Sequence, residues 1–234
     1  MVNKFAQSLT LIRHVRQQTD TAVLFYSSGG KDSIALLDMV SPLFNKVILV
    51  YMYLIKDLDH INIYLDWAKK KFRNVEVMQV PHFVLSTINT FGFFCEPDEA
   101  EKEKKESDII KGIVEKTGVP FVIHGMKGVD GYMKRMRLKK FAKDNNGMFI
   151  SPINVVYPLA LWTNKEVLRY IQAKNLIKPM TYGYQSICYG LSFDYEVLIY
   201  LKNNFNADYK KMMEAFPYLE HVMYDYQRKQ NKAV

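Results

Sequence analysis

The sequence has little of what metal clusters, disulfide frameworks and membrane spans require. Only two of its 234 residues are cysteine, Cys95 and Cys188, and they form neither a CxxC pair nor part of a metal-ligand cluster. No run of about 18 uncharged apolar residues occurs, so we expect no membrane span. The first 20 residues lack the apolar core and cleavage site of a secretory signal. These absences favour a cytoplasmic, reduced protein.

The sequence does contain enough apolar material for a substantial core, together with an excess of positive charge. Hydrophobic residues make up 49% of the chain, and 32 Lys and Arg against 24 Asp and Glu give a formal net charge of +8. A chain of this size is expected to form one or two domains. The basic surplus suits phosphate-bearing ligands and nucleic acid, but an ordinary lysine-rich surface gives the same charge, so charge alone identifies no partner.

Four short apolar stretches predict the strands of a buried, mostly parallel sheet. They are rich in β-branched and aromatic residues and lack clean alternation, as strands covered on both faces do. The predicted strands are 21–27, 46–53, 75–80 and 121–125, and helical patterns separate them at 32–41, 59–73 and 99–117. This alternation predicts a doubly wound, Rossmann-like α/β fold. The chain from residue 192 to its end again shows a helical pattern, so we expect a helical C-terminal extension.

We expect the chain to divide into three parts: an N-terminal amphipathic helix within 1–20, an α/β domain over 21–155, and a mainly helical region over 156–234 packed on it. A helix of the last part should begin near Thr163, because Thr163 and Glu166 form a capping-box pattern. The charge run at 96–108 is interpreted as the solvated face of a helix.

A glycine pair directly after the first strand is the clearest functional signal. The stretch VLFYSSGGKDS (23–33) leads from an apolar strand, through the glycines, into the start of a helix. Glycines let the backbone approach a ligand closely, and the free N–H groups at a helix start point into the same space. Ser27, Ser28 and Ser33 add hydroxyl donors, and Lys31 adds a positive charge. We therefore expect a loop that binds a chain of phosphates.

Two common phosphate-binding patterns do not fit this loop. The pattern GxxxxGK[ST] needs Ser or Thr where this chain has Asp32, and glycine where it has Phe25. The dinucleotide pattern GxGxxG fails because the two glycines are adjacent. What remains is SGGKDS, residues 28–33, which resembles the PP-loop signature SGGxDS of the ATP pyrophosphatase superfamily, at the end of the first strand where that superfamily carries it.

The resemblance implies both an activity and a set of site residues. Enzymes of this superfamily bind ATP with Mg²⁺ and cleave it between the α- and β-phosphates, because a substrate oxygen attacks the α-phosphorus and becomes adenylylated. Fixed N–H donors, a cation and the metal stabilise the charge that builds on the leaving pyrophosphate. The implied nucleotide-binding residues are Ser27, Ser28, Gly29, Gly30, Lys31, Asp32 and Ser33, of which Lys31 and Asp32 are also catalytic candidates. Asp32 either positions Mg²⁺ or organises the loop.

A second stretch, IHGMKGVDGYMKR (123–135), follows the fourth predicted strand. It resembles the GxRxxES..R segment of the branch that holds phosphoadenylylsulfate (PAPS) reductases and the small subunit of ATP sulfurylase. Gly125 matches, whereas Lys127 replaces Arg, Asp130 replaces Glu, Gly131 replaces Ser, and Lys134 or Arg135 stands for the last Arg. The resemblance implies that Lys127, Lys134 and Arg135 contact the substrate anion or the pyrophosphate. A glycine turn before a basic, solvated helix is the alternative interpretation.

A third stretch, YPLALWTNKEVLRYI (157–171), resembles the PL..WT..DVW.YI element of the same branch. We interpret it as a structural helix packed against the α/β domain. With it, the resemblance covers most of residues 20–190 in three ordered blocks.

The cysteines depart from the reductase pattern. Sulfonucleotide reductases carry a catalytic cysteine near the C-terminus, but the tail from residue 221 contains none. A single thiol at Cys188 cannot hold an iron–sulfur cluster, which normally needs four thiolates. Both Cys188 and Cys95 are interpreted as small buried hydrophobes. We therefore expect an enzyme that uses ATP, with a reductase that borrows an external thiol, or a non-catalytic nucleotide-binding subunit, as alternatives.

The acceptor and the partners stay open at this level. Sulfate or a nucleic-acid group would each suit an adenylylating enzyme of this branch, and a partner protein or a homo-oligomer is compatible with the sequence. Tyr53 ends the second predicted strand, where ligands of such sheets lie, so it borders the adenine or belongs to the core. Gly125 is expected beside the nucleotide, and His124 is the histidine best placed for a substrate role.

Overall fold

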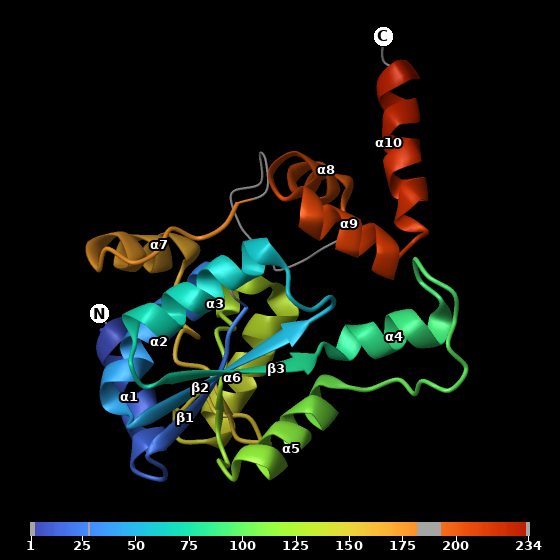
Figure 1. Ribbon diagram of the computed structural model, residues 1–234. Coiled ribbons are helices and arrows are strands. Elements are labelled where there is room, and N and C mark those ends of the chain that lie inside the picture. The colour runs from blue at the N-terminus through green and yellow to red at the C-terminus, as the bar shows by residue number, and fades with distance from the viewer. Residues whose placement is uncertain (1–2, 28, 182–192, 233–234) are drawn as a thin grey trace.

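The computed structural model describes residues 3–27, 29–181 and 193–232 (Figure 1). Within these ranges the chain forms a five-stranded sheet in the order β3-β2-β1-β4-β5, and every neighbouring pair of strands is parallel. The strands are β1 (Thr21–Phe25), β2 (Lys46–Tyr53), β3 (Val75–Pro81), β4 (Val122–Ile123) and β5 (Val155–Val156). The prediction of a doubly wound, parallel α/β fold is confirmed.

The order of the strands determines where a ligand can enter. The chain moves outward from β1 to β2 and β3, then returns across the sheet to β4, on the other side of β1. Crossovers on the two sides of β1 therefore run in opposite directions, and a crevice opens at the carboxyl ends of β1 and β4. The segments that leave these two strands are the glycine-rich loop and the stretch after residue 123.

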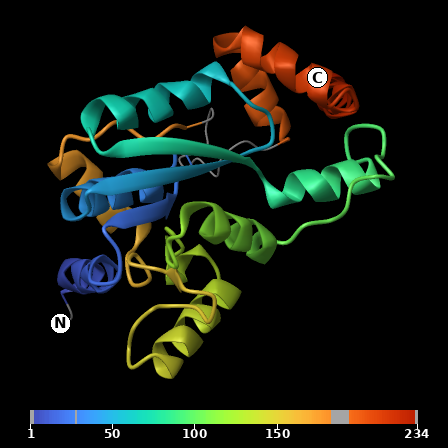
Figure 2. The ribbon, with the colours of Figure 1, turned by 60° about the horizontal axis from the view of Figure 1, so that its bottom comes forward.

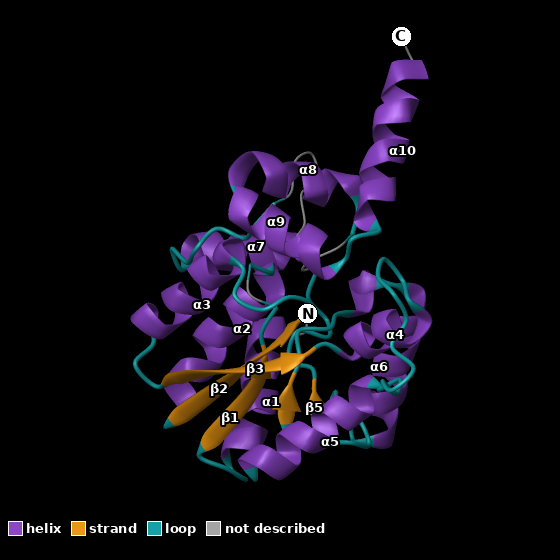
Figure 3. Cartoon of the chain, turned by 45° about the vertical axis from the view of Figure 1, so that its right-hand side comes forward, coloured by secondary structure: helices purple, strands orange, loops and turns teal. Residues whose placement is uncertain are grey.

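Helices cover both faces of the sheet: Figures 1 and 2 show α3 on one side and α5 on the other. The helices are α1 (Lys4–Arg16), α2 (Lys31–Val40), α3 (Asp59–Lys71), α4 (Phe83–Phe91), α5 (Glu106–Thr117), α6 (Tyr132–Asp144), α7 (Asn164–Ala173), α8 (Tyr195–Asn204), α9 (Asn206–Ala215) and α10 (Leu219–Lys232), with short 3-10 turns η1 (Ser41–Leu43) and η2 (Gly128–Asp130). In Figure 3, α8, α9 and α10 lie together beyond one end of the sheet. No helix of the described part is long and apolar enough to cross a membrane.

The helix that follows the glycine pair is held rigidly. Its residues Ile34, Ala35, Leu36 and Leu37 are fully buried, because α2 packs between the sheet and α7. A helix buried on nearly all sides is apolar around its whole circumference, which explains its sequence. Burial of this kind fixes the direction in which the first turn of α2 points.

The predicted helix over 99–117 is wrong in its first part, because α5 begins only at Glu106. The preceding segment is bonded to α4 instead: the Lys104 N–H donates to Ser86 Oγ at 2.8 Å, and the Asp98 N–H donates to the Asn89 carbonyl at 2.8 Å. Backbone groups engaged in this way cannot join a helix. The charge run is therefore a non-helical segment that packs against α4 and becomes helical only from Glu106.

Other differences concern short elements. The strands expected at 21–27 and 121–125 end earlier, at Phe25 and Ile123, and α3 ends at Lys71 rather than at residue 73. Helix α4 and strand β5 were not expected. The boundary predicted after residue 155 falls within β5, and the three-part division stays a prediction.

The N-terminal helix is attached to the C-terminal half of the chain. Lys4 Nζ lies 2.7 Å from Glu166 Oε1, and Trp162 Nε1 donates to Ser8 Oγ at 3.0 Å. Glu166 also accepts the Thr163 N–H at 2.7 Å, while the Thr163 hydroxyl accepts the Glu166 N–H, so the predicted capping box is confirmed. One carboxylate thus caps α7 and anchors α1.

This carboxylate should make stability depend on pH in acid. The hydrogen bonds from Lys4 and from the Thr163 backbone lower the pKa of Glu166 from 4.5 to about 2. Between these values the unfolded state binds more protons, so the contribution of Glu166 is complete above about pH 4.5 and is lost as the pH falls through about 2. We expect the gap in thermal midpoint between the wild type and Glu166→Gln to shrink over this window. A gap independent of pH would contradict the assignment.

Candidate functional site

The loop after β1 turns directly into α2 and leaves the start of that helix uncapped. Gly30 is the N-cap residue, and no side chain bonds to the first N–H groups of α2. These groups and the positive end of the helix dipole form a site for an anion. Ser33 Oγ donates to the Gly30 carbonyl at 2.9 Å, and Ser27 Oγ lies 3.1 Å from Ser33 Oγ. Ser28, the other serine predicted to bind phosphate, lies outside the described residues.

The glycines are required because other groups approach their α-carbons closely. A Cβ on Gly29 would lie 2.7 Å from Met180 Cβ and 3.1 Å from the Tyr64 ring. A Cβ on Gly125 would lie 3.0 Å from Asp32 Cβ, so the segment after β4 and the start of α2 are in close contact. Met180 also donates its N–H to the Gly29 carbonyl at 3.0 Å. Tyr64 and Met180 shape the loop, and no local sequence pattern indicates either residue.

This crowding predicts opposite effects for two glycine-to-alanine changes. Gly29→Ala should lower the free energy of unfolding by about 1–3 kcal/mol, because Met180 Cβ belongs to a backbone segment that must move. Gly112→Ala is the matched control: Gly112 lies within α5 with nothing within 4 Å of the added Cβ. That change should stabilise the protein by about 0.5–1 kcal/mol. Urea unfolding measures both, and equal effects would show that the loop is not tightly packed.

A buried charge network joins the two halves of the crevice. Asp32 Oδ2 accepts hydrogen bonds from Lys127 Nζ at 2.6 Å and from Lys31 Nζ at 3.2 Å. Lys127 Nζ also lies 3.0 Å from Asp130 Oδ1, and the Lys127 N–H donates to Asp130 Oδ2 at 2.8 Å. The Lys127 side chain is fully buried and that of Lys31 is 7% exposed. Two cations and two carboxylates therefore fix the α2 start against the segment after β4.

The network leaves one oxygen for a ligand. Asp32 Oδ1 is buried and has no hydrogen-bond partner among the described residues. Those residues contain no group of three or more His, Cys, Asp or Glu that could hold a metal by itself. Mg²⁺ is commonly held by one or two carboxylates together with phosphates and water, so one oxygen beside an anion site fits it. The predicted Mg²⁺ contact of Asp32 and the predicted anion contact of Lys127 stay predictions.

His124 lies at the end of β4 with its protonation state fixed by its surroundings. Its Nδ1 accepts the Met126 N–H at 3.0 Å, which leaves the proton on Nε2. The ring packs edge-on against Phe25 and Tyr157. Burial, with a smaller effect from the charge of Lys134, lowers the pKa of His124 to about 4. His124 is therefore neutral near pH 7 and can donate a hydrogen bond through Nε2.

The remaining predicted site residues lie at the edges of this centre. Lys134 and Arg135 are exposed in the first turn of α6, and the Arg135 guanidinium lies 5.9 Å from the centre of the Tyr132 ring. Tyr53 ends β2 and is half-buried, with Lys56 Nζ 5.1 Å from the centre of its ring. The roles assigned to these residues stay predictions.

Of the two cysteines, Cys95 lies in the described part of the chain. Cys95 is a free, half-buried thiol in the segment after α4. Burial, reinforced by the charge of Glu96, raises its pKa. A raised pKa keeps sulfur in the thiol form, which is a poor nucleophile. Cys188 lies outside the described residues.

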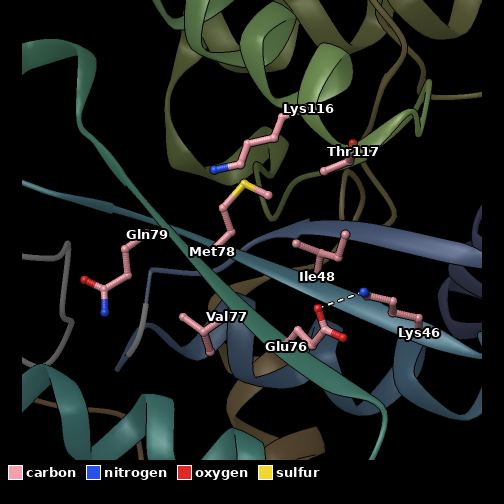
Figure 4. A pocket seen from close by; sticks show the side chains of 8 residues that line it. All are labelled: Lys46, Ile48, Glu76, Val77, Met78, Gln79, Lys116 and Thr117. Atoms are coloured by element: carbon pink, nitrogen blue, oxygen red, sulfur yellow. Dashed lines mark ion pairs between the residues drawn. The ribbon is translucent and has the colours of Figure 1, made fainter.

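A separate hollow, of about 480 Å³, is shown in Figure 4, and no residue of the glycine-rich loop lines it. It is lined by residues from the start of β2, from β3 and from the end of α5: Lys46, Ile48, Glu76, Val77, Met78, Gln79, Lys116 and Thr117. Lys46 and Glu76 form an ion pair of 2.7 Å across its floor (Figure 4). Because strand starts and carboxyl ends lie at opposite edges of a parallel sheet, this hollow is not part of the crevice.

Among the solved structures that match this chain are two whose matched region covers more than nine-tenths of it. The U34-tRNA thiolase NcsA from Methanococcus maripaludis, solved with its [4Fe-4S] cluster, is 16% identical, with 91% of this chain and 78% of that chain covered and a TM-score of 0.43. The NH3-dependent NAD synthetase from Campylobacter jejuni, in complex with nitrate, is 11% identical, with 96% and 95% covered and a TM-score of 0.47. Neither similarity is close enough to assign a function.

Comparison by sequence is more informative about the family. No curated protein matches the chain. The family model of the phosphoadenosine phosphosulfate reductase domain matches residues 22–189, which include the glycine-rich loop, the charge network and all five strands except Thr21, the first residue of β1. This match confirms the resemblance drawn from the three motifs. The chain belongs to the phosphoadenosine phosphosulfate reductase domain family.

Proposed function

We propose that this protein binds ATP with Mg²⁺, cleaves it between the α- and β-phosphates and adenylylates an acceptor. The observation that carries the proposal is the uncapped start of α2, bordered by close-packed glycines and by the buried Lys31. A site of this kind binds phosphates through backbone N–H groups, dipole and cation together. Its position at the switch point of the sheet is where ligands of this fold class bind.

The residues of the site have distinct tasks in this scheme. Bound ATP would supply an electrophilic α-phosphorus and a pyrophosphate leaving group. The N–H groups of the first α2 turn and Lys31 hold the leaving phosphates and stabilise their charge without rearranging, since α2 is fixed in the core. Asp32 is oriented by Lys127 through its Oδ2, which leaves Oδ1 for Mg²⁺. Lys127 is thus a positioning residue for Asp32.

His124 is suited to hydrogen bonding rather than to proton abstraction. Its Nδ1 is occupied by the Met126 N–H, so it has no free lone pair with which to act as a base. Its Nε2–H can donate to an oxygen of a phosphate or of the acceptor. The low pKa keeps this donor neutral across the physiological range.

A reductase of the PAPS type is the second candidate, and the family match is the observation that favours it. Such a reaction needs a thiolate to attack sulfur. The raised pKa of Cys95 works against that role, and in this alternative an external thiol is the nucleophile. A third alternative is a nucleotide-binding subunit that gains activity only with a partner protein.

One product analysis separates these functions. The protein is incubated with Mg²⁺ and ATP labelled in the α-phosphate, with sulfate or RNA as acceptor, and pyrophosphate exchange into ATP is measured in parallel. Labelled AMP or an adenylylated acceptor, with exchange, supports the proposal. Labelled ADP would show cleavage at the other bond and overturn it. Release of sulfite from PAPS with dithiothreitol, without exchange, would identify a reductase, and ATP binding without turnover would indicate a partner-dependent subunit.

A further inference from the structure

Helix α6 carries a concentration of positive charge on the outside of the fold. It is the yellow-green helix at the lower edge of the molecule in Figure 2. Its 13 residues include six cations, all exposed: Lys134, Arg135, Arg137, Lys139, Lys140 and Lys143. Asp144 is its one acidic residue, and Leu138 is its one fully buried residue. A helix with a single buried position does little for the core, so its composition needs another explanation.

The cations of α6 have no ion-pair partner within the described part of the protein. Within the described residues, ten ion pairs occur, and none involves a cation of α6. Lys134 and Arg137 act on Glu106 only at longer range. Cations so close together along a helix repel each other at low ionic strength. A polyanion that lies along the helix would relieve this repulsion and would release its own counterions.

Aromatic and sulfur-containing side chains are interleaved with these cations. Tyr132 is 66% exposed, Met133 is 72% exposed and Met136 is 45% exposed. Tyr132, Met136, Lys139 and Lys143 recur at helical spacing, so apolar and cationic groups share one outward face about 16 Å long. A helix that lies on a membrane separates its apolar and charged faces. Cations interleaved with the exposed Tyr132 ring and the methionines fit a single-stranded nucleic acid, whose backbone meets the charges while a base stacks on the ring.

The place of α6 in the fold connects this face to the crevice. The helix begins at Tyr132, two residues after Asp130, whose carboxylate holds Lys127. Lys127 in turn holds Asp32 at the start of α2. A strand bound along α6 therefore runs toward the proposed ATP site at its Tyr132 end and away from it at its Lys143 end.

We propose that the outward face of α6 binds the sugar–phosphate backbone of a single-stranded nucleic acid, one group of which is the acceptor. The claim that a group of this nucleic acid is the acceptor rests on the proposed ATP-dependent function. The binding itself does not, because it needs only the charges of α6 and the exposed Tyr132 ring.

The test compares two triple variants that remove equal charge. Lys139→Gln, Lys140→Gln and Lys143→Gln change the face of α6, and Lys69→Gln, Lys70→Gln and Lys71→Gln change the exposed end of α3, so each set lowers the net charge of +8 by three. Binding to a fluorescein-labelled single strand of about 20 nucleotides, as RNA and as DNA, is followed by anisotropy across a salt series without ATP. None of these six lysines belongs to the proposed site.

We expect the α6 variant to lose at least tenfold in affinity near 0.1 M salt, and its slope of log K against log salt to fall by about 2, since each backbone contact contributes about 0.7. The α3 variant should stay within threefold of the wild type. Tyr132→Ala should weaken binding about fivefold or more, with the salt slope unchanged, because stacking does not involve counterions.

Three results would overturn the proposal. Equal losses in both triple variants would mean that only net charge matters. Tighter binding to a duplex of the same sequence would refute the single-strand assignment. Co-sedimentation with phosphatidylserine vesicles that depends on α6, without nucleic-acid binding, would make α6 a membrane-binding helix. If any of these results were found together with intact pyrophosphate exchange, the role of α6 would be refuted but the proposed ATP chemistry would stand. If nucleic acid bound through α6 but no exchange occurred, the binding surface would be supported and the ATP chemistry refuted.

Discussion

Lys31→Met is expected to weaken ATP–Mg²⁺ binding about 30- to 150-fold while the protein stays folded. Lys31 is the cation at the uncapped start of α2, and its side chain is 7% exposed, so its attraction for phosphate is weakly screened. Hydrogen bonds to charged groups contribute about 2–3 kcal/mol, which corresponds to that range of affinity. Isothermal titration calorimetry measures the change directly. The fold should persist because Asp32 keeps its shorter bond to Lys127, at 2.6 Å.

Lys69→Met is the matched control for this prediction. Lys69 lies on α3, half exposed, and pairs with Asp66 at 2.7 Å, so the substitution removes the same charge from the surface. It should change ATP affinity by less than a factor of two. If Lys31→Met bound ATP as tightly as Lys69→Met does, the loop after β1 would not be the phosphate site.

Asp208→Ala should lower the free energy of unfolding by about 3–5 kcal/mol, the largest stability effect that we predict. The Asp208 carboxylate, on α9, is completely buried and accepts three hydrogen bonds at the start of α3. They come from the Asp59 N–H at 2.8 Å, the His60 N–H at 2.9 Å and His60 Nδ1 at 2.6 Å. Its removal leaves the buried first turn of α3 uncapped and detaches α9 from the α/β body. Urea unfolding followed by circular dichroism measures the loss.

Two further variants make this test specific. Asp66→Ala removes an exposed carboxylate from α3 itself, and we expect a change below about 0.5 kcal/mol. Asp208→Asn keeps one acceptor oxygen and should fall between the two. A loss below 1 kcal/mol for Asp208→Ala would mean that the buried cap does not hold the helices together.

The parts of the fold that could be predicted from sequence are those encoded by neighbouring residues. Strands β2 and β3, helices α2 and α3, and the capping box of Thr163 and Glu166 each depend on patterns within a dozen residues. The glycine-rich loop was also recognisable, since a strand, two glycines and a helix start are adjacent in the chain. The burial of α2 on nearly all sides agrees with the apolar run at 34–37 in its middle.

The parts that could not be predicted depend on contacts between distant residues. Lys127 and Asp32 are 95 positions apart, so neither motif by itself indicates that these two side chains form an ion pair with each other. Met180 reaches Gly29, and Asp208 reaches His60, through packing that no local pattern specifies. Strand β5 has only two residues, too short for a periodic pattern. The segment before α5 bonds to Ser86 and Asn89 of α4 through its backbone N–H groups, which overrides its helical composition.

The most direct test of the account is a crystal structure with a non-hydrolysable ATP analogue and Mg²⁺. We predict that the terminal phosphates lie within hydrogen-bonding distance of the N–H groups of the first α2 turn and of Lys31 Nζ, with the metal next to Asp32 Oδ1. Phosphates bound elsewhere, for example in the hollow lined by Lys46 and Lys116, with the start of α2 empty, would contradict it.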